Sequence, residues 1–164
     1  MDDARLAIVR EPIDPGRLAH LLTAEAARRG VSHGAVSVFL GAVRAENLGR
    51  RVQHLEYEAY EPLAVKSFDR IATEVADRWP GVILAIHHRL GRLEIGEVSV
   101  GIAALSGHRA EACAASRYAI ERVKQISPIW KREAFEGGQV WIEGATADPD
   151  DERARLEAYR RACA

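Results

Sequence analysis

Cysteine is scarce in this sequence of 164 residues, which contains only Cys113 and Cys163. Cys113 falls in an alanine-rich stretch of helical character and Cys163 lies near the carboxyl end, a spacing typical of neither a disulfide framework nor a zinc site. A chain of this size buries roughly 70% of its unfolded surface and needs neither for stability. We therefore expect one core in a reducing cytoplasm, with no metal and no cofactor, and Cys113 as a small core residue of its helix.

Long apolar runs are also lacking. No stretch approaches the roughly eighteen apolar residues that predict a membrane span, and Met1–Arg5 show no basic region before an apolar run, so we expect no targeting segment. The formal net charge of -1 excludes the broad basic surface of a nucleic-acid binder. Hydrophobic and charged fractions of 48% and 29% are those of a soluble globular protein, so any site for an anion has to be local.

Lysine is rare as well, with three residues against twenty arginines, and two of the three are Lys124 and Lys131. Because arginine serves here as the general surface cation, a retained lysine indicates a place that needs a compact ammonium or an amine able to lose its proton. Two lysines this close also arise by chance in short motifs. The residues around them therefore decide whether the pair is a site.

Helices are predicted from capping residues, apolar periodicity and stop signals. Asp14 is a cap, Pro15 suits the first helical position and Gly30 is a stop. The four predicted helices run from Pro15 to Gly30, from Val65 to Trp79, from Ser106 to a residue before Pro128, and through a solvated tail between Asp148 and Arg161.

Strands are predicted where apolar residues alternate or cluster between turn signals. After a short apolar run at Leu6–Val9, the predicted strands are a buried strand over Gly34–Val43, then Val52–Tyr60, Val82–Leu90, Val98–Leu105, Ile129–Phe135 and Gln139–Glu143. Arg44–Arg51 and Gly91–Gly96 are predicted as turns, and Gly137-Gly138 as the turn of a hairpin. Helices that alternate with strand pairs indicate an α+β fold with a mixed, largely antiparallel sheet. We expect one domain over residues 1–146 and a charged helical tail over 147–164.

Lys124 near a helix carboxyl end is, taken alone, more often a surface cation than a reactive group. Ile120 lies one turn before it and Val123 is adjacent, which places Lys124 at the edge of the apolar stripe. We therefore expect it to be partly desolvated, and an ammonium from Lys131 nearby would further disfavour its protonation. Trp130 between the two lysines is interpreted as a core residue.

Two cations, His108 and Arg109, stand at the amino end of the third predicted helix, where the helix already carries partial positive charge. Backbone amides and two basic side chains at such an end suit a phosphate. Arg44 by itself would be a solvated charge.

These same segments resemble a known family: Gly34-Ala-Val-Ser-Val-Phe-Leu-Gly-Ala-Val-Arg44, then Asn47-Leu-Gly-Arg50, Ser106-Gly-His-Arg109, and Lys124 through Glu133. In the same order, from about Gly34 to Glu143, the chain resembles the catalytic large subunit of molybdopterin synthase, the MoaE family. The resemblance implies an α/β hammerhead fold. It also implies a homodimer that carries two small ubiquitin-like sulfur-carrier subunits, a heterotetramer.

The implied activity is a sulfur transfer in molybdenum cofactor biosynthesis. Sulfur would pass from the thiocarboxylated Gly-Gly end of the small subunit to cyclic pyranopterin monophosphate and form the molybdopterin dithiolene. The residues that match the family's catalytic lysines are Lys124 and Lys131. Those that match its substrate-binding positions are Ala42, Val43, Arg44, His108, Arg109, Lys124, Lys131, Arg132 and Glu133.

The chain departs from the family pattern at three places. Ala45-Glu46 follow the loop arginine in place of His-Asn, Ile120 replaces a methionine, and Gly144-Ala-Thr stand where an arginine is usual. The alternative function is a noncatalytic module that binds a ubiquitin-like tail or an acidic metabolite. The sequence leaves open which lysine has which role and in what order the two sulfurs are transferred.

Helix geometry makes one further prediction about assembly. Arg109 and Lys124 are fifteen residues apart on one helix, which separates them by roughly 22 Å at 1.5 Å rise per residue. One small substrate does not span that distance. If both residues serve one pocket, His108 and Arg109 have to come from the neighbouring protomer of a symmetric dimer.

Overall fold

The computed structural model describes residues 4–142, 144–145 and 147–163, which form four helices and nine strands. The helices are α1 (Pro15–Arg29), α2 (Glu61–Arg78), α3 (Arg109–Ile126) and α4 (Glu152–Ala162). The strands are β1 (Leu6–Val9), β2 (Ala35–Ala42), β3 (Glu46–Asn47), β4 (Arg50–Ala59), β5 (Ile83–Arg89), β6 (Gly91–Glu94), β7 (Val98–Ser106), β8 (Ile129–Phe135) and β9 (Gly138–Ile142). The predicted α+β class is confirmed.

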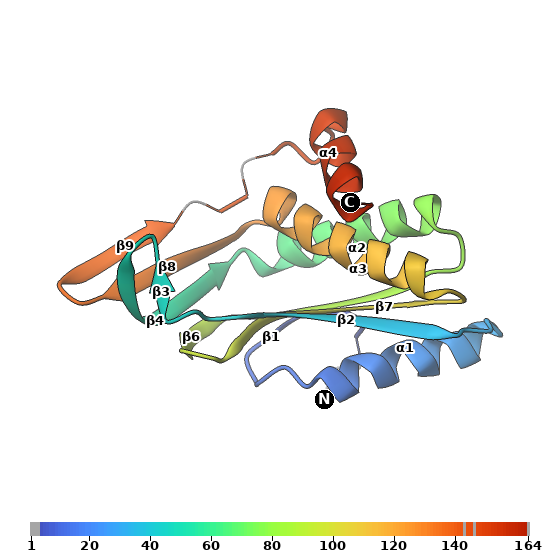
Figure 1. Cartoon of the computed structure of the whole chain (residues 1–164), viewed down its shortest axis with the longest axis horizontal. Helices are drawn as coiled ribbons and strands as arrows, with labels where there is room; N and C mark the ends of the chain where they lie inside the picture. The colour runs from blue at the N-terminus through green and yellow to red at the C-terminus, as the bar shows by residue number, and fades with distance from the viewer. Residues whose placement is uncertain (1–3, 143, 146, 164) are drawn as a thin grey trace.

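The first sheet has the strand order β1-β5-β7-β2. β1 runs parallel to β5, and the other two pairings are antiparallel, so the sheet is mixed and largely antiparallel as predicted. Helix α1 covers one face, and α2 and α3 cover the other (Figure 1). Side chains alternate accordingly: Ile83 of β5 packs on the α1 side, whereas Ile86 packs on the opposite side. Each such buried aliphatic side chain contributes about 1.5–3 kcal/mol.

Helix α1 confirms the predicted start and stop signals. Asp14 accepts a hydrogen bond from the Gly16 N–H at 2.8 Å, and Gly30 ends the helix with a φ of 66°. The helix lies very close to β7 at Gly101, where a Cβ would stand 2.7 Å from Leu18 Cδ1 and 2.8 Å from Ile13 Cγ2. Only glycine therefore lets α1 pack against the sheet at this distance.

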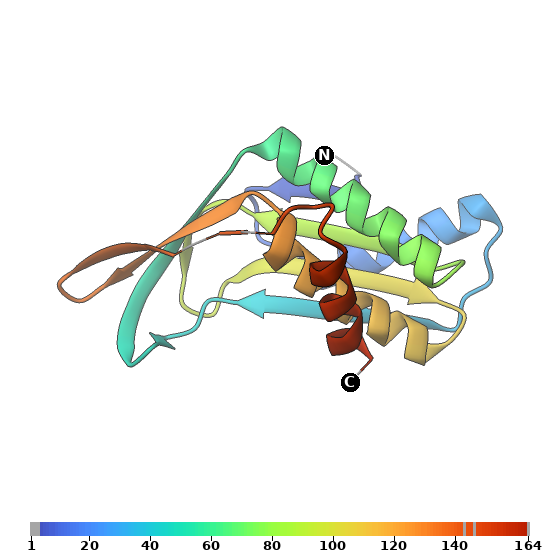
Figure 2. The ribbon, with the colours of Figure 1, turned by 90° about the horizontal axis from the view of Figure 1, so that it is seen from above.

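The second sheet has five strands, in the order β3-β4-β8-β9 with β6 on β4, and all its pairings are antiparallel. It projects beyond one end of the first sheet (Figures 1 and 2). β6 follows β5 after Leu90 alone, so one continuous stretch of chain passes from the first sheet into the second. A small core of Val43, Val52, Leu55 and Leu93 holds this junction.

Two predicted turns contain strands instead. Gly91–Gly96 includes β6, and Arg44–Arg51 includes β3 and the start of β4, with Leu48 (φ 50°) and Gly49 (φ 74°) at the tight turn between them. β6 pairs with residues 54–57 of β4, which are distant in sequence. A local pattern carries no sign of such a partner, so the turn prediction was wrong for this reason.

Strand β2 is also different from its prediction as a buried strand. It lies at the edge of the first sheet and its residues alternate between half-buried and exposed. Val36, Val38 and Leu40 are between 36% and 40% exposed. The strand is apolar on both faces, which is typical of burial, but this chain alone covers only one of them. An exposed apolar edge strand is a site for pairing with another chain.

The tail helix α4 packs on α3, as Figure 1 shows, and is less solvated than predicted because Ala158 and Ala162 are buried. Tyr159 stacks on Tyr118 of α3, with ring centroids 4.4 Å apart. The predicted domain boundary at residue 146 and the predicted strand end at Glu143 fall on residues outside the described ones, and the division into domain and tail stays a prediction.

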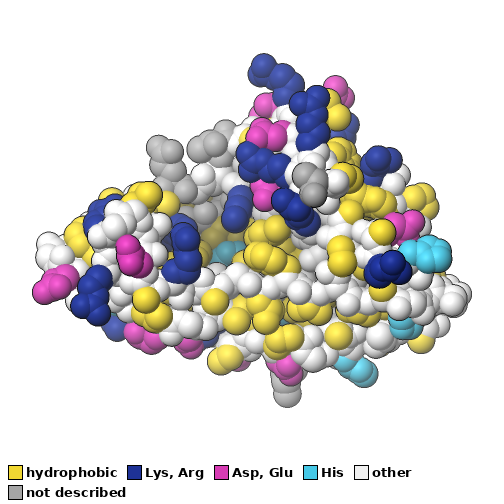
Figure 3. Space-filling view, viewed as in Figure 1, with side chains coloured by type: hydrophobic (Ala, Val, Ile, Leu, Met, Phe, Trp, Pro, Cys, Tyr) yellow, Lys and Arg dark blue, Asp and Glu magenta, His cyan; other side chains and the backbone are white. Residues whose placement is uncertain are grey.

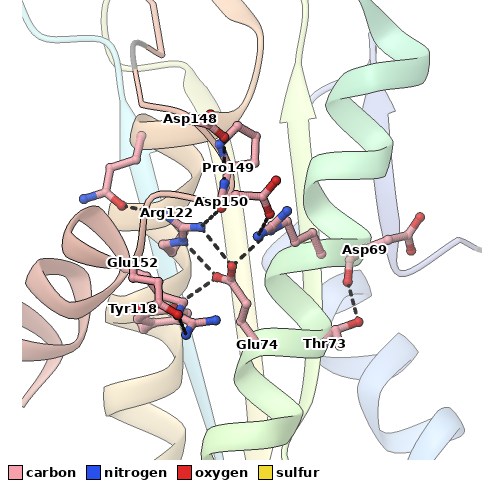
Figure 4. A network of polar contacts seen from close by, with 12 residues as sticks. Asp69, Thr73, Glu74, Tyr118, Arg122, Asp148, Pro149, Asp150 and Glu152 are labelled. Atoms are coloured by element: carbon pink, nitrogen blue, oxygen red, sulfur yellow. Dashed lines mark hydrogen bonds and ion pairs between the residues drawn. The ribbon is translucent and has the colours of Figure 1, made fainter.

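A buried polar network joins α2, α3 and the segment before α4 (Figure 4). Glu74 of α2 accepts hydrogen bonds from the Tyr118 hydroxyl at 2.6 Å and from Arg122 Nε and Nη2 at 2.8 Å each. Arg122, which is fully buried, also donates to the Pro149 carbonyl at 3.2 Å. Burial would raise the pKa of Glu74, but these donors outweigh it and the pKa is lowered. The network therefore holds a charged pair in the core.

Cys113 is exposed, so its prediction as a core residue was wrong. The buried positions of α3 nearest to it are Ala112, Ala115 and Ser116, and Cys113 lies on the outer side of that face. In the described part of the chain, no helix is long and apolar enough to cross a membrane.

Candidate functional site

A cavity of about 640 Å³ opens where the two sheets meet the carboxyl end of α3. Figure 3 shows this side of the molecule hollowed, with lysine and arginine side chains around the hollow. The first sheet, the second sheet, α3 and the loops between them all contribute walls. The lining residues are Phe39, Gly41, Ala42, Arg44, Tyr57, His88, Ser99, Val100, Ile120, Val123, Lys124, Ser127, Ile129, Lys131, Ile142, Gly144 and Ala145.

Lys124 and Lys131 line this cavity together. Helix α3 ends at Ile126 because Pro128 cannot continue it, and the chain turns directly into β8. Lys124 therefore stands in the last turn of the helix, and Lys131 is the third residue of the strand that follows. A spacing of seven residues across a helix end thus brings two amines to one cavity.

The two lysines differ in burial. Lys124 is exposed, so the expectation that it is partly desolvated was wrong. Lys131 is half-buried, and burial lowers the pKa of its ammonium. Glu133 raises this pKa, while the positive charges of Arg44 and Lys124 lower it further. Its ammonium therefore loses a proton more readily than that of an ordinary, solvated lysine.

Arg44, Asn47 and Glu133 form a chain of contacts beside the cavity. Arg44 Nη2 donates to Asn47 Oδ1 at 3.5 Å, and Asn47 Nδ2 donates to Glu133 Oε2 at 2.9 Å. Glu133 is buried, and its Oε1 finds no hydrogen-bond partner within the described residues. An unpaired buried oxygen is costly, and Glu133 itself is not among the residues that line the cavity.

Other predicted substrate-binding residues lie elsewhere. Arg132 is on the opposite face of β8 from Lys131, with its guanidinium paired to Glu56 and 5.4 Å from the Trp141 ring centroid. Val43 is buried in the junction core, whereas Ala42 lines the cavity. Trp130, predicted as core, is 42% exposed because it shares the outer face with Arg132.

His108 and Arg109 are exposed at the amino end of α3 and do not line the cavity. His108 is the N-cap residue and makes no side-chain capping bond. Within one chain they are therefore separate from Lys124, as the helix geometry predicts.

Four polar cavity residues were missed in the sequence: Tyr57 of β4, His88 of β5, Ser99 of β7 and Ser127 after α3. Burial raises the pKa of Tyr57 and the Ser99 hydroxyl opposes that shift. The one available signal was the pair His87-His88 inside an otherwise apolar strand. A buried polar residue in such a strand needs a partner or a function.

Gly144 also lines the cavity. A Cβ at this position would lie 2.7 Å from the Ile129 carbonyl oxygen and 3.0 Å from the Trp130 ring. The backbone therefore approaches β8 too closely for any larger side chain at residue 144. In the described residues, no group of three or more His, Cys, Asp or Glu is placed to hold a metal ion.

Comparisons with known proteins agree with the resemblance. A family model described as "MoaE protein" matches residues 8–126. The chain is 51% identical over 109 residues to the molybdopterin synthase catalytic subunit of Bacillus subtilis (strain 168), which covers 66% of this chain and 69% of that protein. It is 40% identical over 144 residues to the subunit of the same name from Pyrococcus abyssi, which covers 88% of this chain and 95% of that protein.

Two solved structures share the fold. The crystal structure of molybdopterin synthase from Staphylococcus aureus has a TM-score of 0.79 and 42% identity, and the match covers 85% of this chain and 98% of that chain. A protein–protein complex of subunits 1 and 2 of molybdopterin-converting factor from Helicobacter pylori 26695 has a TM-score of 0.70 and 26% identity, covering 91% and 99%. The chain therefore belongs to the MoaE protein family.

Proposed function

We propose that this chain is the catalytic subunit of a molybdopterin synthase. It takes sulfur from the thiocarboxylated end of a small ubiquitin-like subunit and builds the dithiolene of molybdopterin on cyclic pyranopterin monophosphate. The observation that carries the proposal is the cavity shared by Lys124, Lys131 and Arg44 in a chain of the MoaE family. An anionic substrate needs these cations, and dithiolene formation needs groups that move protons.

The lysines have distinct roles in this proposal. Lys131, whose pKa is lowered by burial, carries protons or acts as a transient nucleophile. Lys124 and Arg44 hold the phosphate and keep the pKa of Lys131 low. Glu133 holds Asn47, which in turn accepts a hydrogen bond from Arg44. Ala42 lines the cavity wall beside Arg44.

The working assembly is a homodimer within a heterotetramer. The exposed apolar edge of β2, with Val36, Val38 and Leu40, supports contact with a second copy, because soluble chains rarely leave such an edge uncovered. His108 and Arg109 then reach the cavity of the partner protomer, since α3 places them far from Lys124 in their own chain. We place this assembly in the cytoplasm, where cofactor synthesis and reduced cysteines are compatible.

A single turnover tests the function. Purified chain is mixed with thiocarboxylated small subunit and cyclic pyranopterin monophosphate, and molybdopterin is measured after conversion to a fluorescent derivative. Formation of product that depends on the thiocarboxylate is expected. Binding of the small subunit without product would instead identify a noncatalytic module.

A further inference from the structure

The buried wall of the cavity carries a histidine that the roles proposed for Arg44 and the lysines leave unused. His88 of β5 is 5% exposed and lines the cavity. Its ring stands edge-on to the Tyr57 ring of β4, with centroids 5.1 Å apart. One ring belongs to the first sheet and the other to the second, so the junction of the sheets fixes the imidazole in place.

The contacts of His88 define its tautomer. Nδ1 is 3.1 Å from the Arg89 carbonyl oxygen, which can only accept, so Nδ1 carries the hydrogen. Burial lowers the pKa of the imidazole to about 4, so the ring is neutral at pH 7. Nε2 is then an acceptor, and none of the described residues donates a hydrogen bond to it. A fixed neutral acceptor on a cavity wall selects for a donor on the ligand.

The cavity therefore offers two kinds of chemistry to one ligand. Arg44 and Lys124 suit a phosphate, whereas the wall with His88 carries no charge and is flanked by the apolar Val100. We propose that His88 is a specificity-determining residue whose Nε2 accepts a hydrogen bond from a ring N–H of the pyranopterin. This inference rests on the proposed function and adds the orientation of the substrate, with its heterocycle at His88 and its phosphate at the cations.

A backbone N–H of the small subunit's Gly-Gly tail offers the same donor chemistry, and the experiment has to separate the two sources. His88→Phe removes the acceptor and keeps a planar ring against Tyr57. His88→Gln places an amide oxygen at the reach of Nε2 and restores an acceptor. His87→Phe is the matched control, because His87 is the adjacent residue of the same strand, is equally buried and bonds through Nε2 to the Ala4 carbonyl oxygen at 2.9 Å.

The measurements are KM for cyclic pyranopterin monophosphate, kcat, and Kd for the thiocarboxylated small subunit. His88→Phe is expected to raise KM about tenfold or more, the scale of one substrate hydrogen bond left unmade. The kcat and the Kd for the small subunit should stay within about twofold of the values of the unaltered chain. His88→Gln should bring KM most of the way back to the value of the unaltered chain. A purely structural histidine would instead give the same result for His88→Phe and His87→Phe.

An unchanged KM in folded His88→Phe overturns the proposal. A raised Kd for the small subunit in place of a raised KM overturns it as well. If His88→Phe does not fold, His88→Asn replaces it, because asparagine keeps the donor to Arg89 but is too short to present an acceptor at Nε2. Equal KM values for His88→Asn and His88→Gln then overturn the proposal. Failure of the proposed function is distinguishable, because the unaltered chain would form no molybdopterin at all.

Discussion

The buried pair Glu74–Arg122 provides a stability prediction that the structure makes quantitative. Replacing Glu74 by glutamine removes the carboxylate that accepts from Tyr118 and twice from Arg122. Arg122 is fully buried, so its guanidinium would remain in the core without its counter-charge. The amide nitrogen of glutamine would also face hydrogen-bond donors.

Removing one partner of a buried, hydrogen-bonded ion pair costs about 3–5 kcal/mol. For a chain of this size each kcal/mol lowers Tm by about 2–4 °C, so the expected loss is roughly 10 °C. Replacing Glu74 and Arg122 together by methionine should cost much less than Glu74→Gln, because no uncompensated charge is then buried. The pair therefore adds little to the free energy of unfolding, but loss of one partner lowers it strongly.

Thermal unfolding followed by circular dichroism measures this effect. Glu121→Gln is the matched control, because Glu121 of α3 likewise pairs with an arginine of another helix, Arg161 of α4 at 2.9 Å, but this pair is partly exposed to solvent. Its loss should cost at most about 1 kcal/mol. A Tm loss for Glu74→Gln no larger than that for Glu121→Gln would refute the reasoning.

Three further predictions concern pH and assembly. The pKa of His88 is lowered from 6.5 in the unfolded chain to about 4 in the folded one. Its contribution to the free energy of unfolding should therefore be complete above pH 6.5 and decrease by about 3 kcal/mol as the pH falls to 4. Urea unfolding of His88→Phe should lack this decrease. Lys124→Gln removes a charge that lowers the pKa of Lys131, so the acid limb of the pH–kcat profile should move to higher pH, whereas Lys124→Arg should leave it in place. Mixing inactive Arg109→Ala and Lys124→Ala chains should partly restore activity if sites are composite, and no rescue would exclude a shared site.

The helices could be predicted because their signals are local. Asp14, Pro15 and Gly30 mark both ends of α1, and Pro128 sets the end of α3 that brings Lys124 near Lys131. The strands β3 and β6 could not be predicted, since their pairing with β4 depends on residues far away in sequence. The exposure of β2 could not be predicted for a similar reason. An apolar pattern indicates burial, but it does not show whether the same chain or a second chain covers the strand.

Within the site, residue types were predictable and environments were not. The scarcity of lysine singled out Lys124 and Lys131, but the burial of each side chain depends on the tertiary packing, which leaves Lys124 exposed and half-buries Lys131. Arg132 and Trp130 follow from strand alternation once Lys131 is known to face inward. His88 lines the cavity only because the two sheets meet beside it, and no local sequence motif predicts that junction.

The central claim is that Lys131 supplies an amine for the chemistry and not only a positive charge. Lys131→Arg keeps the charge, but guanidinium stays protonated in proteins. The measurement is the single-turnover rate of molybdopterin formation at saturating thiocarboxylated small subunit and pyranopterin. Lys66→Arg is the control, because Lys66 is exposed on α2 and lies outside the cavity. The rate should fall by about a hundredfold or more for Lys131→Arg and stay unchanged for Lys66→Arg, and a near-normal rate for Lys131→Arg would contradict the account.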